Sequence, residues 1–145
     1  MPKVDFYVLE DPSSTARLRF ACKLIEKAYH NQYSLDVLTT DTRISQQIDD
    51  LLWTFRDGSF IPHELYDANR VTSPVLIGSD FSDRIVTPGT PVVLVNLGTE
   101  IPGYFDRYQR ITEVVSADPV IRQQARCRFQ FYRDKGHEPE SHNII

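Results

Sequence analysis

The chain has few of the features that mark cross-linked, metal-bound or membrane-spanning proteins. Only 2 of its 145 residues are cysteines, too few for a disulfide framework or a cysteine-rich zinc site. The longest apolar run, Val92 to Val95, is much shorter than the roughly 20 residues that span a bilayer. The first residues lack a basic segment followed by a long apolar one, so we expect no secretory leader and a cytoplasmic location.

Cofactor and catalytic motifs are missing as well. The first strand-to-helix loop contains Glu10 and Asp11 but no glycine, which excludes the glycine-rich phosphate loops of nucleotide-binding proteins. The four histidines are scattered along the chain, and we interpret them as surface residues: His30, His63, His137 and His142. We therefore expect no metal, no cofactor and no catalytic residues.

What is present is an alternation of strands and helices. Strands are predicted at residues 4–9, 35–39, 74–77, 91–97 and 111–115, and the strand at 91–97 is apolar enough to be buried on both faces. Helices are predicted from the 11–14 turn to Asn31, from a cap at Asp41 or Thr42 through Leu52, and over 119–136, with a helical turn near Phe105 and Tyr108. This order predicts a single α/β domain over residues 1–145, a mostly parallel sheet flanked by helices with Rossmann-like topology but no nucleotide site. Residues 137–145 are expected to be a frayed tail.

The last helix has an unusual polar side. Its periodicity predicts a core face formed by Val120, Ile121, Ala125, Cys127, Phe131 and Tyr132. By the same periodicity, Cys22 of the first helix and Cys127 are expected to be buried, reduced thiols. A second stripe, with spacing i, i+4, i+7 and i+11, is exposed in this interpretation and carries Arg122, Arg126, Phe129 and Arg133. A phenylalanine among three arginines suggests a surface for a ligand that carries both an anion and an apolar group.

The charge distribution narrows the class of ligand. Residues 119–136 carry five cationic side chains and one carboxylate, a net charge of +4, in a chain whose net charge is −4. The rest of the chain therefore carries −8, which is unfavourable for broad contact with a nucleic-acid backbone. A short acidic partner that docks at the helix is favoured, and an ordinary solvated helix face is the alternative.

A second informative segment is the aromatic stretch from Leu51 to Leu65, which holds the single tryptophan of the chain. Leu51 and Leu52 complete the core face of the second helix. Trp53, Phe60 and Pro62 are then expected in or beside a loop, where large apolar groups are typical anchors of a protein interface. The alternative is that the loop folds back as a small satellite core.

Together these segments resemble the chi subunit family of bacterial DNA polymerase III, an accessory of its clamp loader. The most specific match is the block of Leu52 and Trp53 with residues 59–65, Ser-Phe-Ile-Pro-His-Glu-Leu. The supporting matches, in the same order along nearly the whole chain, are residues 4–9, 92–97, 113–115, 125–126, 132–133 and Gly136.

The resemblance implies a non-enzymatic adaptor. In that family one surface binds the acidic C-terminal tail of single-stranded DNA-binding protein, which ends in a Pro-Phe carboxylate, and the matching positions here are Arg122, Arg126 and Phe129. Arg133 is expected to extend this surface. A second surface binds the psi subunit, and Trp53 and Phe60, with Pro62 beside them, occupy the corresponding positions.

Two departures from the family pattern lie in the tail-binding helix. Phe129 stands where a tyrosine is expected, and Gln130 where a lysine is typical. Two other functions stay open at this point: a nucleotide-binding α/β enzyme, and a module that binds single-stranded DNA directly by stacking bases between arginines. The adaptor interpretation expects contact with nucleic acid only indirectly, through the protein partner, and no contact with membranes.

Overall fold

The computed structural model describes residues 2–58, 60–87 and 89–144, and within these ranges the chain forms seven strands, three α-helices and one 3-10 turn. The strands are β1 (Lys3–Leu9), β2 (Ser34–Leu38), β3 (His63–Leu65), β4 (Val75–Gly78), β5 (Val92–Asn96), β6 (Arg110–Val115) and β7 (Glu140–Ile144). The helices are α1 (Ser14–His30), α2 (Thr42–Thr54) and α3 (Pro119–Asp134), and the 3-10 turn η1 spans Phe105–Arg107.

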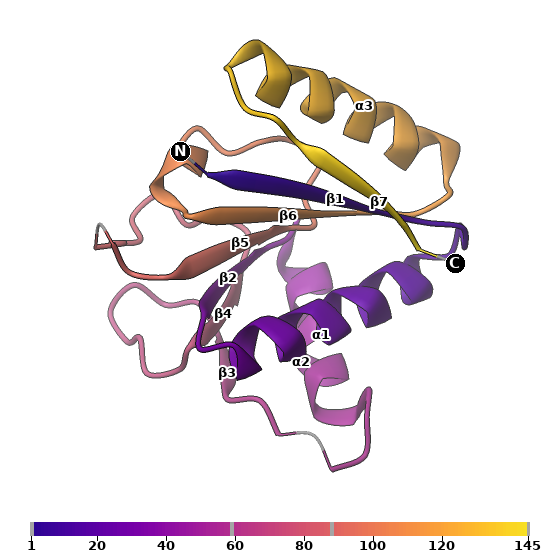
Figure 1. Cartoon of the computed structure of the whole chain (residues 1–145). Coiled ribbons are helices and arrows are strands. Elements are labelled where there is room, and N and C mark those ends of the chain that lie inside the picture. The colour runs from indigo at the N-terminus through magenta and orange to yellow at the C-terminus, as the bar shows by residue number, and fades with distance from the viewer. Residues whose placement is uncertain (1, 59, 88, 145) are drawn as a thin grey trace.

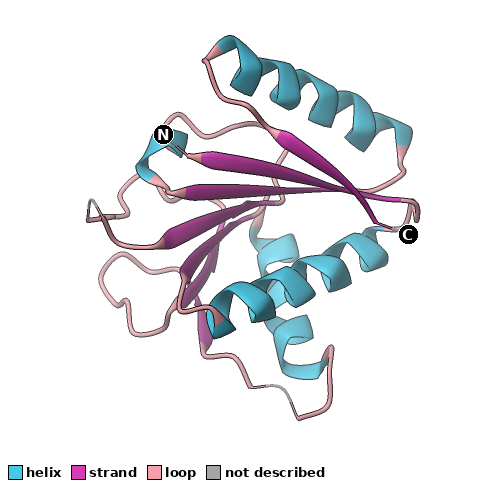
Figure 2. Cartoon of the chain, viewed as in Figure 1, coloured by secondary structure: helices cyan, strands magenta, loops and turns pink. Residues whose placement is uncertain are grey.

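The strands form one open sheet in the order β3-β4-β2-β5-β6-β1-β7 (Figure 2). Every pairing between neighbours is parallel, so the α/β prediction is confirmed. Strands β3 and β7 form the two edges of the sheet, and β1 lies between β6 and β7. Parallel pairing requires crossover connections, and the helices supply several of them.

The helices form layers on both sides of this sheet. Figure 1 shows α1 and α2 on one face and α3 on the other. Beneath α1 and α2, aliphatic side chains of the sheet pack with Ile25, Ile48 and Leu52. Beneath α3, Phe6 and Ile111 pack with Ala125 and Tyr132. The apolar β5 is buried along its whole length, as its sequence predicts.

Polar side chains fix where each helix begins. Ser13 caps α1 by accepting a hydrogen bond from the amide of Ala16, and Asp41 caps α2 by accepting one from the amide of Ile44. Asp118 caps α3, where one carboxylate oxygen accepts from the amides of Val120 and Ile121. These caps satisfy amides that have no partner within the helix.

The C-terminal segment corrects one prediction. Residues 137–145 were expected to be a frayed tail, but within the described part of this segment residues 140–144 form β7, which pairs in parallel with β1 from Asp5 to Leu9. The strand is polar and gains its order from this pairing rather than from an apolar pattern of its own. Short β3 was not predicted either. Ser59, in the motif that carries the family resemblance, lies outside the described residues.

Candidate functional site

A hollow of about 270 Å³ lies between α3 and the β7 edge of the sheet, and we call it the α3 hollow. It is lined by apolar groups of the sheet, by one flank of α3 and by two polar side chains of β7. These residues are Phe6, Val8, Val115, Arg122, Ala125, Arg126, Phe129, Ser141 and Asn143. Three of the four residues of the predicted stripe therefore meet at one cavity. The fourth, Arg133, is exposed and is not among the lining residues.

Arg122 is positioned with part of its donor capacity unused. Its Nη2 donates a hydrogen bond to the carbonyl of Leu9 at 3.0 Å, which ties the side chain to the end of β1. Its Nε is buried and has no hydrogen-bond partner among the described residues. A buried N–H of a cation without a partner is costly, and an anion in the hollow could satisfy it.

Arg126 and Phe129 supply the other two groups of the stripe that can contact a ligand, a guanidinium and an aromatic ring. Arg126 is exposed, and the one hydrogen bond of its side chain to another described residue is a long one, 3.4 Å from Nη1 to the Gln123 side-chain oxygen. Phe129 is half-buried and packs edge-on against Phe6, with ring centroids 5.2 Å apart. The guanidinium is thus free to turn toward a ligand, while the phenyl ring is held in place.

This geometry corrects the predicted faces of α3. Phe129 does not stand on a fully solvated stripe, because the stripe flanks the buried side of the helix. The buried side centres on Ala125, Arg128 and Tyr132, whereas Val120, Phe131 and Cys127 of the predicted core face are exposed. The prediction that Cys127 is a core thiol is wrong, and the burial of Cys22 is confirmed.

The buried side of α3 differs from the predicted core face because Arg128, a charged residue, has a buried partner. Its Nε donates to Glu113 of β6 at 3.0 Å, and both side chains are almost fully buried. Asn96 and Tyr132 donate to the other carboxylate oxygen at 3.0 and 3.2 Å. Burial raises the pKa of the Glu113 carboxyl, and the Arg128 charge opposes this shift. The periodicity of apolar residues cannot predict that a charged residue lies on the core face of a helix.

A second exposed surface, the aromatic patch, consists of Trp53, Phe60 and Pro62. Trp53 lies in the last turn of α2 rather than in a loop, and the exposed fractions of Trp53 and Phe60 are 54% and 67%. Their ring centroids are 5.8 Å apart, and Pro62 is half-buried. The two exposed rings do not form a satellite core. The neighbouring Ile61 is buried at 1% exposure and anchors the loop.

His63 supports the aromatic patch from beneath. Its ring centroid lies 4.5 Å from that of Trp53, and its two ring nitrogens lie 2.7 and 3.1 Å from the backbone carbonyls of Ile61 and Asp49. The expectation of a surface histidine is therefore wrong at this position, because the ring links the start of β3 to α2.

Sequence reasoning missed the walls that the sheet contributes to the α3 hollow. Ser141 and Asn143 belong to β7, and the polar sequence of that strand gives no strand signal. Phe6 and Val8 alternate along β1 toward α3, and this alternation was the one available signal for an apolar floor. The strand alone does not show which helix covers that face, because Tyr7 and Leu9 on the opposite face are also large and apolar.

The carboxyl ends of β2, β4 and β5 border another hollow, of about 390 Å³. This is the edge where doubly wound α/β proteins bind their ligands. Here, however, Asp80 and Glu100 are among its lining residues, and none of the described lining residues is lysine or arginine. The local charge is unfavourable for a nucleotide phosphate.

Among the described residues, no helix is both long and apolar enough to cross a membrane.

The chain is similar to known proteins of one family. The family model for the DNA polymerase III chi subunit, HolC, matches residues 1–140. The chain is 36% identical over 145 residues to the DNA polymerase III subunit chi of Pseudomonas aeruginosa, covering 99% of this chain and 98% of that protein. It is 25% identical over 140 residues to the subunit chi of Haemophilus influenzae, covering 96% and 95% of the two chains. The chain therefore belongs to the DNA polymerase III chi subunit family.

Proposed function

We propose that this accessory subunit of the replicative DNA polymerase is a non-catalytic adaptor with two docking surfaces. The α3 hollow binds the acidic C-terminal tail of single-stranded DNA-binding protein. The aromatic patch binds a psi-like subunit, which connects the chain to the clamp loader. Membership of the chi family supports the role in replication, and the two partners follow from the family resemblance and from the chemistry of the two surfaces.

The observation that carries the first proposal is the meeting of Arg122, Arg126 and Phe129 at one cavity. A Pro-Phe terminus presents a carboxylate next to an aromatic ring. Arginine binds a carboxylate with paired, charge-assisted hydrogen bonds, and the apolar floor receives the ring. A volume of about 270 Å³ suits one or two side chains and lies at the small end of cofactor pockets.

The charge of α3 supports the same ligand. Arg122 and Arg126 border the α3 hollow, and Arg133 is exposed one turn beyond Phe129. Aspartates that precede the terminal residues of the tail would be attracted to these cations without a fixed geometry. Gln130, where a lysine is typical of the family, donates to Asp134 at 2.8 Å and adds no charge to this attraction.

The aromatic patch supports the second proposal by its composition. Exposed aromatic rings that contact one another without a covering element are typical of interface hot spots. The α2 helix behind them is held by buried Ile48 and Leu52, so the rings are presented from a rigid base.

A titration with a synthetic tail peptide tests the first surface. The peptide ends in Pro-Phe and is used with a free or an amidated C-terminus. We expect Arg126→Ala to weaken binding by on the order of 2 kcal/mol, because one partner of a charge pair is lost. Arg126→Lys should recover only part of this, since an ammonium group cannot make the bidentate contact. Phe129→Ala should weaken binding by removing the ring contact.

Arg43→Ala is the matched control, because Arg43 is an exposed arginine on α2, remote from the α3 hollow. It should bind the peptide like the wild type. Equal affinity of wild type, Arg126→Ala and Arg43→Ala would contradict the proposal. Binding of single-stranded oligonucleotides or of ATP at the same site, in place of the peptide, would favour the two alternative functions.

A further inference from the structure

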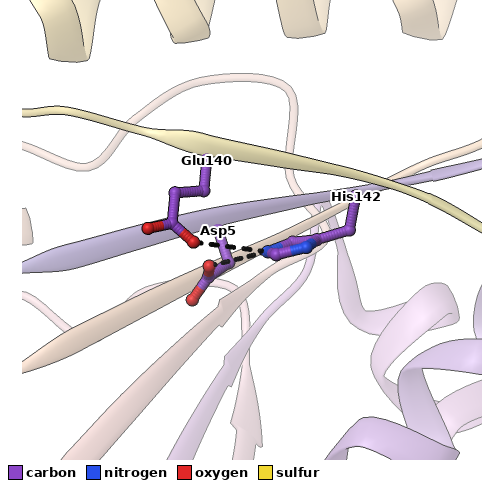
Figure 3. Close-up of side chains that lie close together, drawn as sticks. All are labelled: Asp5, Glu140 and His142. Carbon is purple, nitrogen blue, oxygen red and sulfur yellow. Dashed lines mark hydrogen bonds and ion pairs between the residues drawn. The ribbon is translucent and has the colours of Figure 1, made fainter.

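Three potential metal ligands meet on the face of the sheet opposite the α3 hollow. Asp5 of β1 is in register with Glu140 of β7, and Tyr7 is in register with His142. Residues 140 and 142 therefore share one side of β7, while residues 141 and 143 point to the α3 hollow. Figure 3 shows the side chains of Asp5, Glu140 and His142 converging.

The distances are close to those of a coordination site. The Nε2 atom of His142 lies 2.9 Å from a carboxylate oxygen of Asp5 and 3.9 Å from one of Glu140. All three ligand atoms lie within 4.8 Å of one another. Zinc bonds of about 2.0–2.1 Å in a tetrahedral arrangement place neighbouring ligand atoms roughly 3.3 Å apart. The Glu140 side chain is exposed, so its rotation would bring its oxygen closer to the other two ligand atoms.

The surroundings hold two of the ligands in position. The His142 ring stacks on Tyr7, with centroids 4.9 Å apart and an interplanar angle of 23°. Asp5 is buried, and its second oxygen accepts from Arg110 Nη2 at 3.3 Å. Asp5 can therefore bind a metal through one oxygen while the other stays on Arg110, an arrangement common around metal-binding carboxylates.

The charge balance permits a dication. With His142 neutral, the two carboxylates and Arg110 sum to −1, and Lys27 of α1 borders the same hollow as Asp5 and Arg110. An imidazole together with two carboxylates favours zinc and similar transition metals over magnesium or calcium, which prefer all-oxygen sites. The remaining coordination positions would be completed by water, since Glu140 and His142 are not fully covered.

From this arrangement we infer that Asp5, Glu140 and His142 bind one zinc-class divalent cation, which fastens the edge strand β7 to β1. The strand that the metal would hold also forms one wall of the α3 hollow through Ser141 and Asn143. The metal site is independent of the ligand that the α3 hollow binds.

The test is a calorimetric titration of the chelator-treated full chain with zinc chloride, repeated with Co²⁺ and read by visible absorption. We expect one equivalent of metal and a rise in melting temperature. His142→Gln and Glu140→Gln should each weaken zinc binding by about tenfold or more, at least the cost of disturbing a ligand's supporting partner. Glu140→Gln is the decisive variant, because the hydrogen bond between Asp5 and His142 does not require Glu140.

His30→Gln and Glu138→Gln are matched controls, since both residues are exposed and neither belongs to the cluster. They should bind zinc like the wild type. Melting curves in the presence of chelator show whether each variant is folded. Undetectable binding at millimolar zinc, or equal affinity in the His142, Glu140 and control variants, would overturn the inference and leave a hydrogen-bonded clasp without metal.

Discussion

The two edges of the sheet carry the two candidate docking surfaces, and they differ in chemistry. At the β7 edge, the α3 hollow combines two arginines with an apolar floor. At the opposite edge, next to β3, the aromatic patch presents Trp53 and Phe60 over the buried ring of His63. The first surface suits a charged peptide end, and the second suits the apolar face of a folded partner.

The contacts that hold the helices of the two surfaces on the sheet also differ, polar in one case and apolar in the other. Helix α3 is fixed to the sheet through the buried ion pair of Arg128 and Glu113, whereas α2 is fixed by aliphatic packing around Ile48 and Leu52. A polar anchor is specific but intolerant of losing one partner. We therefore expect the two edges to respond differently to substitution and to salt.

The largest expected effect is on the α3 anchor. Arg128→Ala leaves Glu113 buried without its counter-ion, and we expect the free energy of unfolding to fall by about 3–5 kcal/mol. Arg126→Ala, two residues away on the exposed flank, should change it by less than about 0.5 kcal/mol. Urea denaturation of both variants measures the difference. Similar stability of the two would contradict the assignment of Arg128 as the anchor.

A double variant distinguishes loss of the charge pair from loss of packing. Replacing Glu113 by Gln and Arg128 by Met removes both charges and keeps most of the volume. It should recover part of the stability lost in Arg128→Ala, because neither member of the pair is then left as a buried charge without its partner. A double variant as unstable as Arg128→Ala would indicate that packing around the guanidinium, not its charge, holds the helix.

The next effect concerns the aromatic patch. Trp53→Ala should weaken capture of the psi-like subunit by about 2 kcal/mol or more, the range of an interface hot spot. The free energy of unfolding should change by about 1 kcal/mol or less, because the side chain is largely exposed. Pull-down of the psi-like subunit and urea denaturation provide the two measurements.

Ile85→Ala is the control, since Ile85 is 83% exposed on a different loop. It should affect neither measurement. Affinity for the tail peptide should stay at the wild-type value in both variants. A stability loss of about 3–5 kcal/mol in Trp53→Ala would show that the ring belongs to the core.

Added salt should have a smaller effect, and it should weaken binding at one of the two surfaces more than at the other. Raising ionic strength screens exposed charges, so peptide binding at the α3 hollow should weaken, on the order of tenfold if several exposed pairs contribute. Capture through the aromatic patch should change little. Titrations at low and high sodium chloride with each partner provide the comparison, and equal salt dependence at both edges would remove the distinction between them.

Much of the fold could be predicted because the central elements carry strong patterns. The apolar β5 is predicted from the sequence and confirmed, and of the two predicted caps of α2, Asp41 and Thr42, the structure shows Asp41. The two strands that were missed, β3 and β7, are the edges. An edge strand buries little apolar surface of its own, and β7 is ordered by pairing with β1, a partner more than 130 residues away that local periodicity cannot supply.

The candidate site could be predicted only in part, because a sequence shows spacing within one helix but not its contacts with other elements. The spacing of Arg122, Arg126 and Phe129 placed them on one flank of a helix, and the structure gathers them at one cavity. Arg133 continues the same spacing but lies beyond the end of that cavity. The burial of Arg128 depends on Glu113, which lies on another element. A pattern read along one helix shows neither the partner nor the extent of the cavity.

The prediction with the smallest expected effect uses the two cysteines as probes of α3. Cys127 is exposed, while Cys22 is buried and burial raises the pKa of its thiol to about 12. An alkylating reagent at neutral pH should therefore modify one thiol per folded chain, and Cys127→Ser should abolish the fast reaction. Because Cys127 does not line the α3 hollow, labelled protein should bind the tail peptide like unlabelled protein. Mass spectrometry and a peptide titration provide the readouts. Two fast thiols in the native state would place Cys22 in contact with solvent, and a loss of peptide binding after labelling would extend the docking surface around the helix, away from the β7 edge.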